Sequence, residues 1–297
     1  MFVRIMYYIV YGLLYAFSLL PLRVLYFFSD VAFFLICYVF GYRKQVVMDN
    51  LRQAFPEKTE KERIKIARKF YRNFTDTFIE TIKMISASDS YIEKRVHGNW
   101  EVLNQYYESG RSLQIHLGHN FNWEWANLTA PKKVKYLFLV VYMPISSKIM
   151  DRLFYKLRSR SGSKLLSATK MREAFMPYRD LQYILTLAAD QNPGNPSKAW
   201  WFDFLGRPAP FVKGPEKGAR AKNTVVVFAF IHKPRRGYYE IVFSLAEENP
   251  VSLLEKELTK RFVRYLEDVI RQYPDMWLWS HRRWKHEWKP EYGEMVK

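Results

Sequence analysis

The fold is decided by residues 112–126, which read SLQIHLGHNFNWEWA. The apolar run Ser112–Leu117 is short and lies between two glycines, so it predicts a buried strand. Asn122 is suited to cap a helix that begins at Trp123. The stretch therefore predicts a strand, a short loop and a helix in direct succession.

His119 and Glu124 lie five positions apart, the histidine in this loop and the glutamate in the first helical turn. Within one helix, five residues correspond to about 500° of rotation, so the two side chains could not share a face. Only a turn from loop to helix brings the imidazole and the carboxylate together. We therefore expect His119 to be a general base that takes a proton from a hydroxyl, with Glu124 orienting its ring.

Strand-like and helix-like segments alternate from about residue 95 onward. The predicted strands are Ser112–Leu117, Val134–Tyr142, Leu181–Ala188, Thr224–Ile231 and Tyr239–Ala246. The predicted helices are Trp123–Leu128, Ser146–Arg160, Lys170–Tyr178, Pro215–Lys222 and Val251–Gln272. This alternation predicts an α/β domain with a mostly parallel central sheet flanked by helices. Ligands of such sheets bind beyond the carboxyl ends of the strands, where His119 and Asp190 would lie.

The composition of the chain points to an anionic partner and to a membrane interface. A chain of 297 residues fits one large domain with extensions. Its 47 Lys and Arg against 29 Asp and Glu give a net charge of +18, which suits nucleic acid, acidic lipid or an acidic carrier protein. Aromatic residues make up 18% of the chain, and Tyr and Trp suit a membrane interface. The single cysteine, Cys37, excludes an intramolecular disulfide and is interpreted as a small hydrophobic residue.

The N-terminus carries two apolar runs. The uncharged run Ile5–Leu22 is just long enough to cross a hydrocarbon core of about 30 Å. A second run, Val24–Tyr42, is interrupted only by Asp30 and is followed by basic residues, which favour a cytoplasmic position for the rest of the chain. One spanning helix with an interfacial helix, or a hairpin within one leaflet, would fit, and two ordinary core helices are the alternative.

We accordingly divide the chain into an N-terminal membrane anchor, residues 1–42, and a domain of residues 43–297. At the start of this domain, Glu60–Ser86 predicts a long amphipathic helix, because its apolar residues recur at three- and four-residue spacing. The opposite face of this helix is basic, so it would suit an anionic membrane surface.

The spacing of His119 and Glu124 resembles the His-x4-Asp/Glu signature of glycerolipid-type acyltransferases. The Asn-Trp-Glu sequence that completes it resembles the late acyltransferases of lipid A biosynthesis. Four further segments resemble this family, in the family's order. They are Asp190-Gln191 after a strand, the aromatic-Gly-x-Pro stretch Trp201–Ala209, the helix-then-strand element Gly214–Phe228, and the basic-aromatic segment Pro274–Lys285. The resemblance covers nearly the whole chain.

The resemblance implies an O-acyltransferase that moves a fatty acyl chain to a hydroxyl of a lipid A precursor. The implied donor is an acyl-carrier protein thioester, with acyl-coenzyme A as the alternative, and no cofactor is implied beyond this co-substrate. The acceptor oxygen would attack the thioester directly, without an acyl-enzyme. The implied location is the bacterial inner membrane, with the catalytic domain on the cytoplasmic side.

The resemblance also adds residues to the site. Arg158 looks like the counterpart of an arginine important in the family, although Arg160 could equally occupy that role. Asp190 and Gln191, together with Asn122, would support the developing oxyanion or bind substrate through hydrogen bonds.

Two other functions fit parts of the sequence. A lysophospholipid or another polar lipid could be the acceptor, because Lys213–Lys217 and Pro234–Gly237 are not close copies of the best-known lipid A enzymes. A membrane-anchored nucleic-acid-binding protein would use the positive charge and the segment Trp277–Lys289. That function leaves His119 and the apolar N-terminus unexplained, so no nucleic acid partner is expected.

No metal site is expected. His116, His119 and Glu124 could supply zinc ligands by type, but the pleat of a strand sets the direction of His116, which need not converge with His119. The chain also has no Gly-x-Ser-x-Gly elbow, no phosphate-binding Gly-rich loop and no dinucleotide-binding fingerprint.

Overall fold

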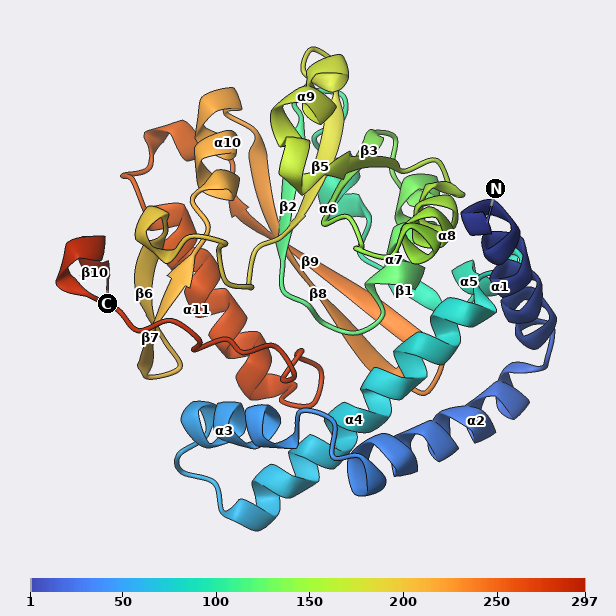
Figure 1. The fold of residues 1–297 in the computed structure, drawn as a ribbon. Coiled ribbons are helices and arrows are strands. Elements are labelled where there is room, and N and C mark those ends of the chain that lie inside the picture. Colours follow the sequence, from blue (N-terminus) through green and yellow to red (C-terminus); the bar gives the residue numbers. More distant parts are fainter. Residues whose placement is uncertain (1, 297) are drawn as a thin grey trace.

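A computed structural model describes residues 2–296, which are built around a seven-stranded sheet (Figure 1). Its strands are β1 (Val96–Gly98), β2 (Leu113–Leu117), β3 (Leu137–Tyr142), β4 (Lys164–Ser167), β5 (Tyr183–Ala188), β8 (Val225–Arg235) and β9 (Tyr238–Glu247). Their order is β1-β9-β8-β2-β5-β3-β4, and every neighbouring pair is parallel except β8 with β9. The predicted α/β fold with a mostly parallel sheet is confirmed.

A second, small sheet of three short strands lies beside the large one (Figure 1). Its strands are β6 (Trp200–Phe204), β7 (Arg207–Phe211) and β10 (Met295–Val296), in the order β10-β6-β7. Leu205 and Gly206 form the turn between the antiparallel strands β6 and β7, with φ angles of 53° and 79°. Two-residue turns with positive φ at both positions match the twist of paired strands, so this hairpin is locally encoded. The sequence analysis did not predict it, nor the short strands β1 and β4.

The helices largely follow the predicted pattern. The α-helices are α1 (Phe2–Ser18), α2 (Leu22–Phe34), α3 (Lys44–Ala54), α4 (Glu60–Lys83), α5 (Asp89–Glu93), α6 (Glu101–Asn104), α7 (Trp123–Lys133), α8 (Lys148–Ser159), α9 (Met171–Phe175), α10 (Gly214–Lys222) and α11 (Glu257–Gln272). A π-helix, η1, covers Leu35–Val39, and 3-10 turns cover Ala168–Lys170, Met176–Tyr178, Pro196–Lys198, Pro250–Ser252 and Pro290–Tyr292. The predicted boundaries differ most at α7, which continues to Lys133 and so delays β3, and at α11, which begins only at Glu257 after a 3-10 turn.

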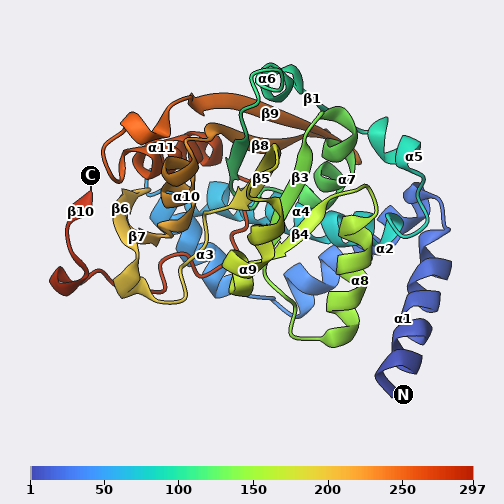
Figure 2. The ribbon, with the colours of Figure 1, turned by 90° about the horizontal axis from the view of Figure 1, so that it is seen from above.

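Helices cover both faces of the large sheet (Figures 1 and 2). One core contains side chains of α3, α4, α10, α11 and the small sheet, and the other contains α7, α8 and the end of α4. Alternate residues of β8 enter the two cores, Val226 and Phe228 on one side and Val225 and Val227 on the other. Burial on both faces explains why β8 is a continuous apolar run and not an alternating one.

The N-terminal apolar region forms two helices that meet near Pro21. The run Ile5–Leu22 is not one continuous helix, because α1 ends at Ser18 and α2 begins at Leu22. Proline removes a backbone donor and disfavours helical geometry in the residue before it, which explains the break. α1 has 17 residues and at 1.5 Å per residue is about 25 Å long, shorter than a hydrocarbon core of about 30 Å.

The segment Leu22–Val39, formed by α2 and η1, is the one helix within residues 2–296 that is long and apolar enough to cross a membrane. This rests on length and composition alone, with a mean hydropathy of 1.8 over the segment. Only 17% of the segment is buried, and Phe27 and Phe34 are 64% and 57% exposed. A core helix would be mostly buried, so the alternative that these are ordinary core helices does not hold.

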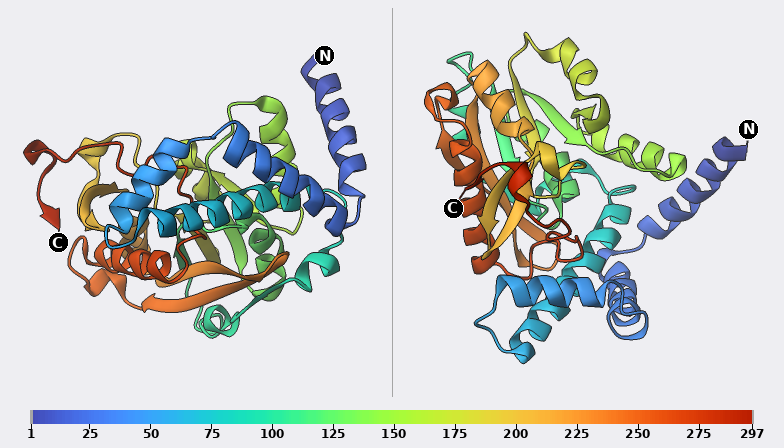
Figure 3. Two further views of the ribbon diagram at one scale, coloured as in Figure 1. Left: turned by 90° about the horizontal axis from the view of Figure 1, so that it is seen from below. Right: turned by 60° about the vertical axis from the view of Figure 1, so that its left-hand side comes forward.

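Both N-terminal helices are fastened to the rest of the molecule: α1, whose N-terminal end extends outward (Figure 3), contacts α4 and α8 and buries Tyr7. α2 packs along α4, and the hydroxyl of Ser29 donates to Asp76 Oδ1 at 2.7 Å. Arg236, in the turn between β8 and β9, pairs with Asp30 of α2 at 2.8 Å and with Asp76 of α4 at 2.6 Å. The division of the chain at residue 42 stays a prediction.

Candidate active site

His119 and Asp190 lie just beyond the carboxyl ends of two neighbouring parallel strands, β2 and β5. The chain can bring them together because residue 118 is a glycine. A Cβ atom there would lie 2.7 Å from Leu266 Cδ1 and 3.4 Å from Asp190 Oδ2. With any larger residue, either the buried Leu266 side chain or the loop would have to shift.

Asp190 holds both the backbone and the ring of His119. The backbone N–H of His119 donates to Oδ2 at 2.8 Å, and Nδ1 lies 2.5 Å from Oδ1. A carboxylate can only accept, so Nδ1 carries a proton and the neutral ring has its lone pair on Nε2. No hydrogen bond to Nε2 is found within residues 2–296, and the His119 side chain is 23% exposed. Nε2 is thus the nitrogen available to a substrate.

His119 and Asp190 shift each other's pKa. Burial alone would raise the pKa of Asp190, but the His119 ring and the hydrogen bonds from His119 and Trp277 lower it to about 2. Burial opposes a charged His119 ring, but the Asp190 carboxylate outweighs it, so the pKa of His119 is raised above its ordinary value. Asp190 therefore remains ionised and favours the imidazolium that forms when His119 accepts a proton.

Glu124 faces Arg158 and not His119. The Nε of Arg158 donates to both carboxylate oxygens, at 3.1 and 3.0 Å, and Nη2 donates to Oε1 at 2.5 Å. No hydrogen bond between Glu124 and His119 is found in the described part of the chain. This corrects the expectation that Glu124 orients the imidazole: Asp190, brought in by the neighbouring strand, occupies Nδ1, while α8 supplies Glu124 with a guanidinium.

The structure distinguishes the two arginines that the sequence left open. Arg158 lines the cavity beside His119, and its side chain is 17% exposed. Arg160 instead reaches the outside of the molecule, where Nη2 pairs with Asp89 of α5 at 3.0 Å. Arg158 is therefore the arginine of this site.

An apolar cavity of about 280 Å³ opens beside His119, between α7 and the sheet. His119, Glu124 and Arg158 are among its few polar lining residues. The apolar lining includes Ile115, Leu117, Ala130, Phe138, Val140 and Phe243. Through β5, Phe138 is level with Leu113 at the start of β2, so the cavity extends along the sheet toward the amino-terminal end of β2. A cavity with a charged mouth and an apolar interior fits an alkyl chain attached to a polar reacting group.

The family model of bacterial lipid A biosynthesis acyltransferases matches residues 1–286. The chain belongs to this family. The family resemblance stated from the sequence is confirmed, and it assigns the chain to acyl transfer in lipid A biosynthesis. A comparison with curated proteins found no significant match.

In this acyltransferase, Asn122 supports the loop from inside the protein. Its Oδ1 accepts from the backbone N–H of Trp125 at 3.2 Å, which confirms the predicted helix cap. Its Nδ2 donates to Glu80 at 2.6 Å, and the residue has no exposed surface. Both ends of the amide are therefore occupied, which corrects the expectation that Asn122 contacts substrate. Gln191 is partly exposed at the same rim, and its role stays a prediction.

The C-terminal segment of the acyltransferase fastens the site from outside the sheet. Trp277 donates its indole N–H to Asp190 Oδ2 at 2.7 Å and forms a β-bridge with Asn120. The guanidinium of Arg283, which has no exposed surface, donates to Asn192 Oδ1 at 2.8 Å. Sequence reasoning missed these contacts, although it identified Pro274–Lys285 as a family segment, because no local pattern links that segment to Asp190.

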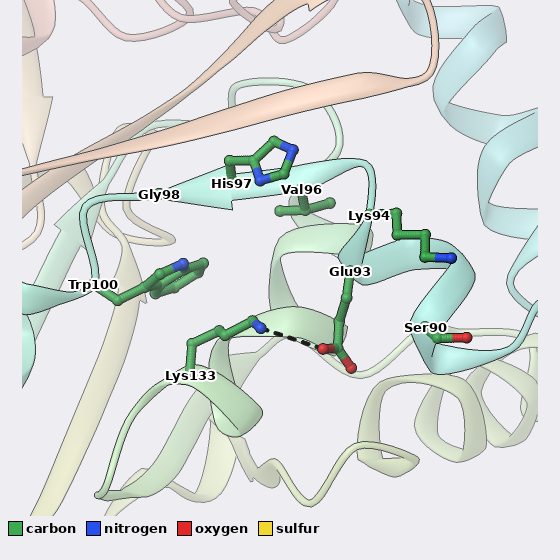
Figure 4. A pocket seen from close by; sticks show the side chains of 8 residues that line it. All are labelled: Ser90, Glu93, Lys94, Val96, His97, Gly98, Trp100 and Lys133. Carbon is green, nitrogen blue, oxygen red and sulfur yellow. Dashed lines mark ion pairs between the residues drawn. The ribbon is translucent and has the colours of Figure 1, made fainter.

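A larger hollow of about 530 Å³ lies elsewhere on the acyltransferase (Figure 4). Its lining residues are Ser90, Glu93, Lys94, Val96, His97, Gly98, Trp100 and Lys133. Lys133 and Glu93 form an ion pair in it, at 3.3 Å. None of these residues lines the His119 cavity, so size alone does not mark the site.

His116 does not join His119. It is 2% exposed, and burial lowers its pKa to about 3. Its Nε2 lies 3.0 Å from the side-chain amide of Gln114, and its ring packs against Phe228 and Phe262, in the core that α11 forms on the far face of the sheet from α7. Within residues 2–296, no group of three or more His, Cys, Asp or Glu is arranged to hold a metal ion.

Proposed function

We propose that this acyltransferase moves a fatty acyl chain from an acyl-carrier protein thioester to a hydroxyl of a lipid A precursor. We place the reaction on the cytoplasmic side of the bacterial inner membrane. The observation that carries the proposal is His119, whose Nδ1 is held by Asp190 and whose Nε2 is open at the mouth of an apolar cavity. This is the arrangement that a hydroxyl and a long-chain thioester require.

The proposed chemistry is one direct transfer. His119 Nε2 takes the proton of the acceptor hydroxyl as its oxygen attacks the thioester carbonyl. The tetrahedral intermediate then collapses, the carbon–sulfur bond breaks, and an ester remains on the acceptor. The proton passes from His119 to the leaving thiolate, which restores the neutral base. No residue becomes acylated, and the thioester supplies all the driving force, so no cofactor is needed.

Arg158 is proposed to stabilise the oxyanion of the intermediate. Glu124 holds Nε and Nη2 of its guanidinium, which fixes the plane of the group. Nη1 has no hydrogen-bond partner within residues 2–296 and belongs to a side chain that lines the cavity. A preorganised cation at this place would act when negative charge develops on the carbonyl oxygen. Glu124 would thus support the reaction through Arg158, while Asp190 supports it through His119.

The cavity and the surface charge support the proposed donor. The apolar interior suits the acyl chain, and its far wall at Phe138 and Ala130 would limit the length of that chain. A net charge of +18 suits an acidic carrier protein and an anionic membrane surface. Acyl-coenzyme A is the competing donor, because its thioester would present the same reacting atoms.

The N-terminal helices support a location at the membrane. Apolar side chains of α1 and α2 are exposed, among them Leu13, Phe27 and Phe34. Their burial in lipid would be favourable in either proposed arrangement, with α2 and η1 spanning the bilayer or with both helices lying in one leaflet. Basic residues on the exposed face of α4, such as Lys65 and Lys69, would then meet lipid headgroups.

Nothing in the structure favours the nucleic-acid alternative. Binding of single strands would require the aromatic side chains of Trp277–Lys289 to stack on bases. Trp277 and Trp279 are 1% and 0% exposed and belong to the core. The indole of Trp277 is moreover engaged with Asp190.

The proposal is tested by acyl transfer in membranes that contain the full-length chain. Wild type, His119→Ala and the matched control His97→Ala, an exposed histidine in another part of the sheet, are given carrier-protein and coenzyme A thioesters. A lipid A precursor and a lysophospholipid are offered together, and products are identified by mass spectrometry. We expect a lipid A species heavier by one acyl chain, made by wild type and His97→Ala only. Transfer to the lysophospholipid alone would overturn the acceptor, and transfer by His119→Ala at the wild-type rate would overturn the mechanism.

A further inference from the structure

Glu80 of α4 is a fully buried carboxylate that no cation contacts within residues 2–296. Three neutral groups from three different elements donate to it. The hydroxyl of Tyr26 in α2 donates to Oε1 at 2.6 Å. Asn122 Nδ2, in the loop after His119, and the hydroxyl of Tyr239 in β9 donate to Oε2 at 2.6 and 2.5 Å. The carboxylate therefore joins α2, the sheet and the His119 loop at one point.

The buried position of Glu80 disfavours a charged carboxylate. Burial raises the pKa of Glu80 to about 7, although the positive charge of Lys233 and the donors from Tyr239 and Tyr26 counteract this. An apolar residue in its place would leave three donors without an acceptor, so the carboxylate is the acceptor on which the three elements converge.

Of the three contacts of Glu80, the one with Asn122 connects it to the loop that carries His119. Asn122 adopts φ and ψ of 61° and 61°, a left-handed backbone conformation that residues other than glycine rarely take. Its amide is held at both ends, by Glu80 and by the backbone N–H of Trp125. This residue sits between His119 and Glu124, so its conformation sets how the loop leaves β2 and how α7 begins.

Glu80 also fixes the start of α7 directly. The indole N–H of Trp125 donates to the backbone oxygen of Glu80 at 2.9 Å, and Trp125 has no exposed surface. Neither Glu80 nor Asn122 lines the His119 cavity, so neither contacts substrate. Their influence on the reaction can only be exerted through the position of the loop.

We propose that Glu80 is a positioning residue, which holds Asn122 in its left-handed conformation and thereby aligns His119 with the cavity, and which ties this loop through Tyr26 to the membrane-facing helix α2. This inference rests on the proposed function, because alignment of His119 matters only if His119 is the base. It predicts that the loop is disturbed whenever Glu80 and Asn122 cannot share a hydrogen bond.

A pair of exchanges isolates this contact. Asn122→Asp keeps a residue that caps helices and tolerates a positive φ, but above the raised pKa of Glu80 it sets two carboxylates against each other at the position of the 2.6 Å contact, so the variants are compared at alkaline pH. Glu80→Gln restores the bond in that background, because the new amide at position 80 can donate to the new carboxylate at position 122. Glu101→Gln, at an exposed glutamate of α6 whose side chain makes no hydrogen bond or ion pair within residues 2–296, is the matched control.

The variants are compared as full-length protein in membranes, with kcat and KM measured for the carrier-protein thioester and the lipid A precursor. We expect Asn122→Asp to lower kcat about a hundredfold with KM unchanged, and the double variant to recover kcat to within about tenfold of wild type. Glu101→Gln should match wild type. A general loss of folded protein would lower the amount of active enzyme in both single and double variants, so recovery of kcat is specific to the pair.

Tyr26→Phe keeps the inference testable if Asn122→Asp does not fold. It deletes one donor to the buried carboxylate, and we expect kcat about threefold to tenfold lower with KM unchanged. Wild-type kcat in Tyr26→Phe, or a double variant no better than Asn122→Asp, would overturn the inference while the proposed function stands. No transfer by wild type to any acceptor would instead overturn the proposed function, and this inference with it.

Discussion

Asp190 and Glu124 are both buried carboxylates beside the His119 loop, but they stand in different surroundings. Asp190 accepts from N–H groups of His119 and Trp277, and it lies at the end of a strand, 71 residues from the histidine. Glu124 lies five residues from His119, yet it pairs with Arg158 at the mouth of the cavity. Proximity along the chain therefore did not decide which carboxylate holds the imidazole. The parallel pairing of β2 with β5 decided it.

The difference teaches what the family spacing of histidine and glutamate reports. It reports a loop-to-helix turn that places the two side chains in different surroundings, His119 against Asp190 and Glu124 against Arg158. In the proposed mechanism the base belongs to the Asp190 side and the cation for the oxyanion to the Glu124 side. The following variants separate these two sides.

Removal of the base itself should have the largest effect. His119→Ala takes away the proposed base, so we expect kcat to fall about 10³-fold or more, within the range of general-base catalysis. The measurement is the initial rate of acyl transfer at saturating donor and acceptor. A fall of less than tenfold would mean that a group other than His119 accepts the proton.

The Asp190 side is tested by Asp190→Asn, which should lower kcat about 10²- to 10³-fold because an amide can favour the wrong ring tautomer. His119 acts as a neutral base, so activity falls as pH falls through its pKa. Asp190 raises that pKa, whereas burial lowers it. Without the carboxylate, the acid limb of the profile of kcat/KM against pH should therefore move to lower pH.

The Glu124 side is tested by Glu124→Gln, which keeps the shape of the side chain but removes the charge that faces Arg158. We expect kcat to fall about 10- to 100-fold, because a bidentate charged pair that orients the guanidinium is lost. The acid limb of the pH profile should stay where it is in wild type. If Glu124→Gln moved that limb as far as Asp190→Asn does, the two carboxylates would share one role and the comparison would fail.

The smallest effect should come from the far wall of the cavity, away from both carboxylates. Ala130 is 4% exposed and lines this wall, so Ala130→Leu should shorten the space for an acyl chain. We expect the preference for long over short acyl donors to fall about tenfold, in line with the cost of a misfitted methylene or two. Competition between carrier-protein thioesters of different length measures this ratio. An unchanged ratio would show that the chain lies elsewhere.

The sequence predicted the large sheet well because its strands are long and apolar on both faces, as β8 is. It missed β1 and β4, since strands of three and four residues carry too few residues for a periodic signal. It also missed the β6–β7 hairpin, which is marked by its turn at Leu205 and Gly206 and not by an alternating pattern. It also read Ile5–Leu22 as one apolar run, although Pro21 separates two helices there. The apolar pattern alone therefore did not reveal the short strands, the hairpin turn or the break between α1 and α2.

The candidate site divides in the same way. The sequence by itself determined the strand–loop–helix succession at His119, the cap at Asn122 and the family, because all three depend on residues close together in the chain. Only the tertiary structure decided that Asp190 holds His119, that Arg158 pairs with Glu124, and that Glu80 accepts a hydrogen bond from Asn122. These partners come from other strands and helices, and a buried charge binds whichever donor the fold brings nearest, at any separation along the chain.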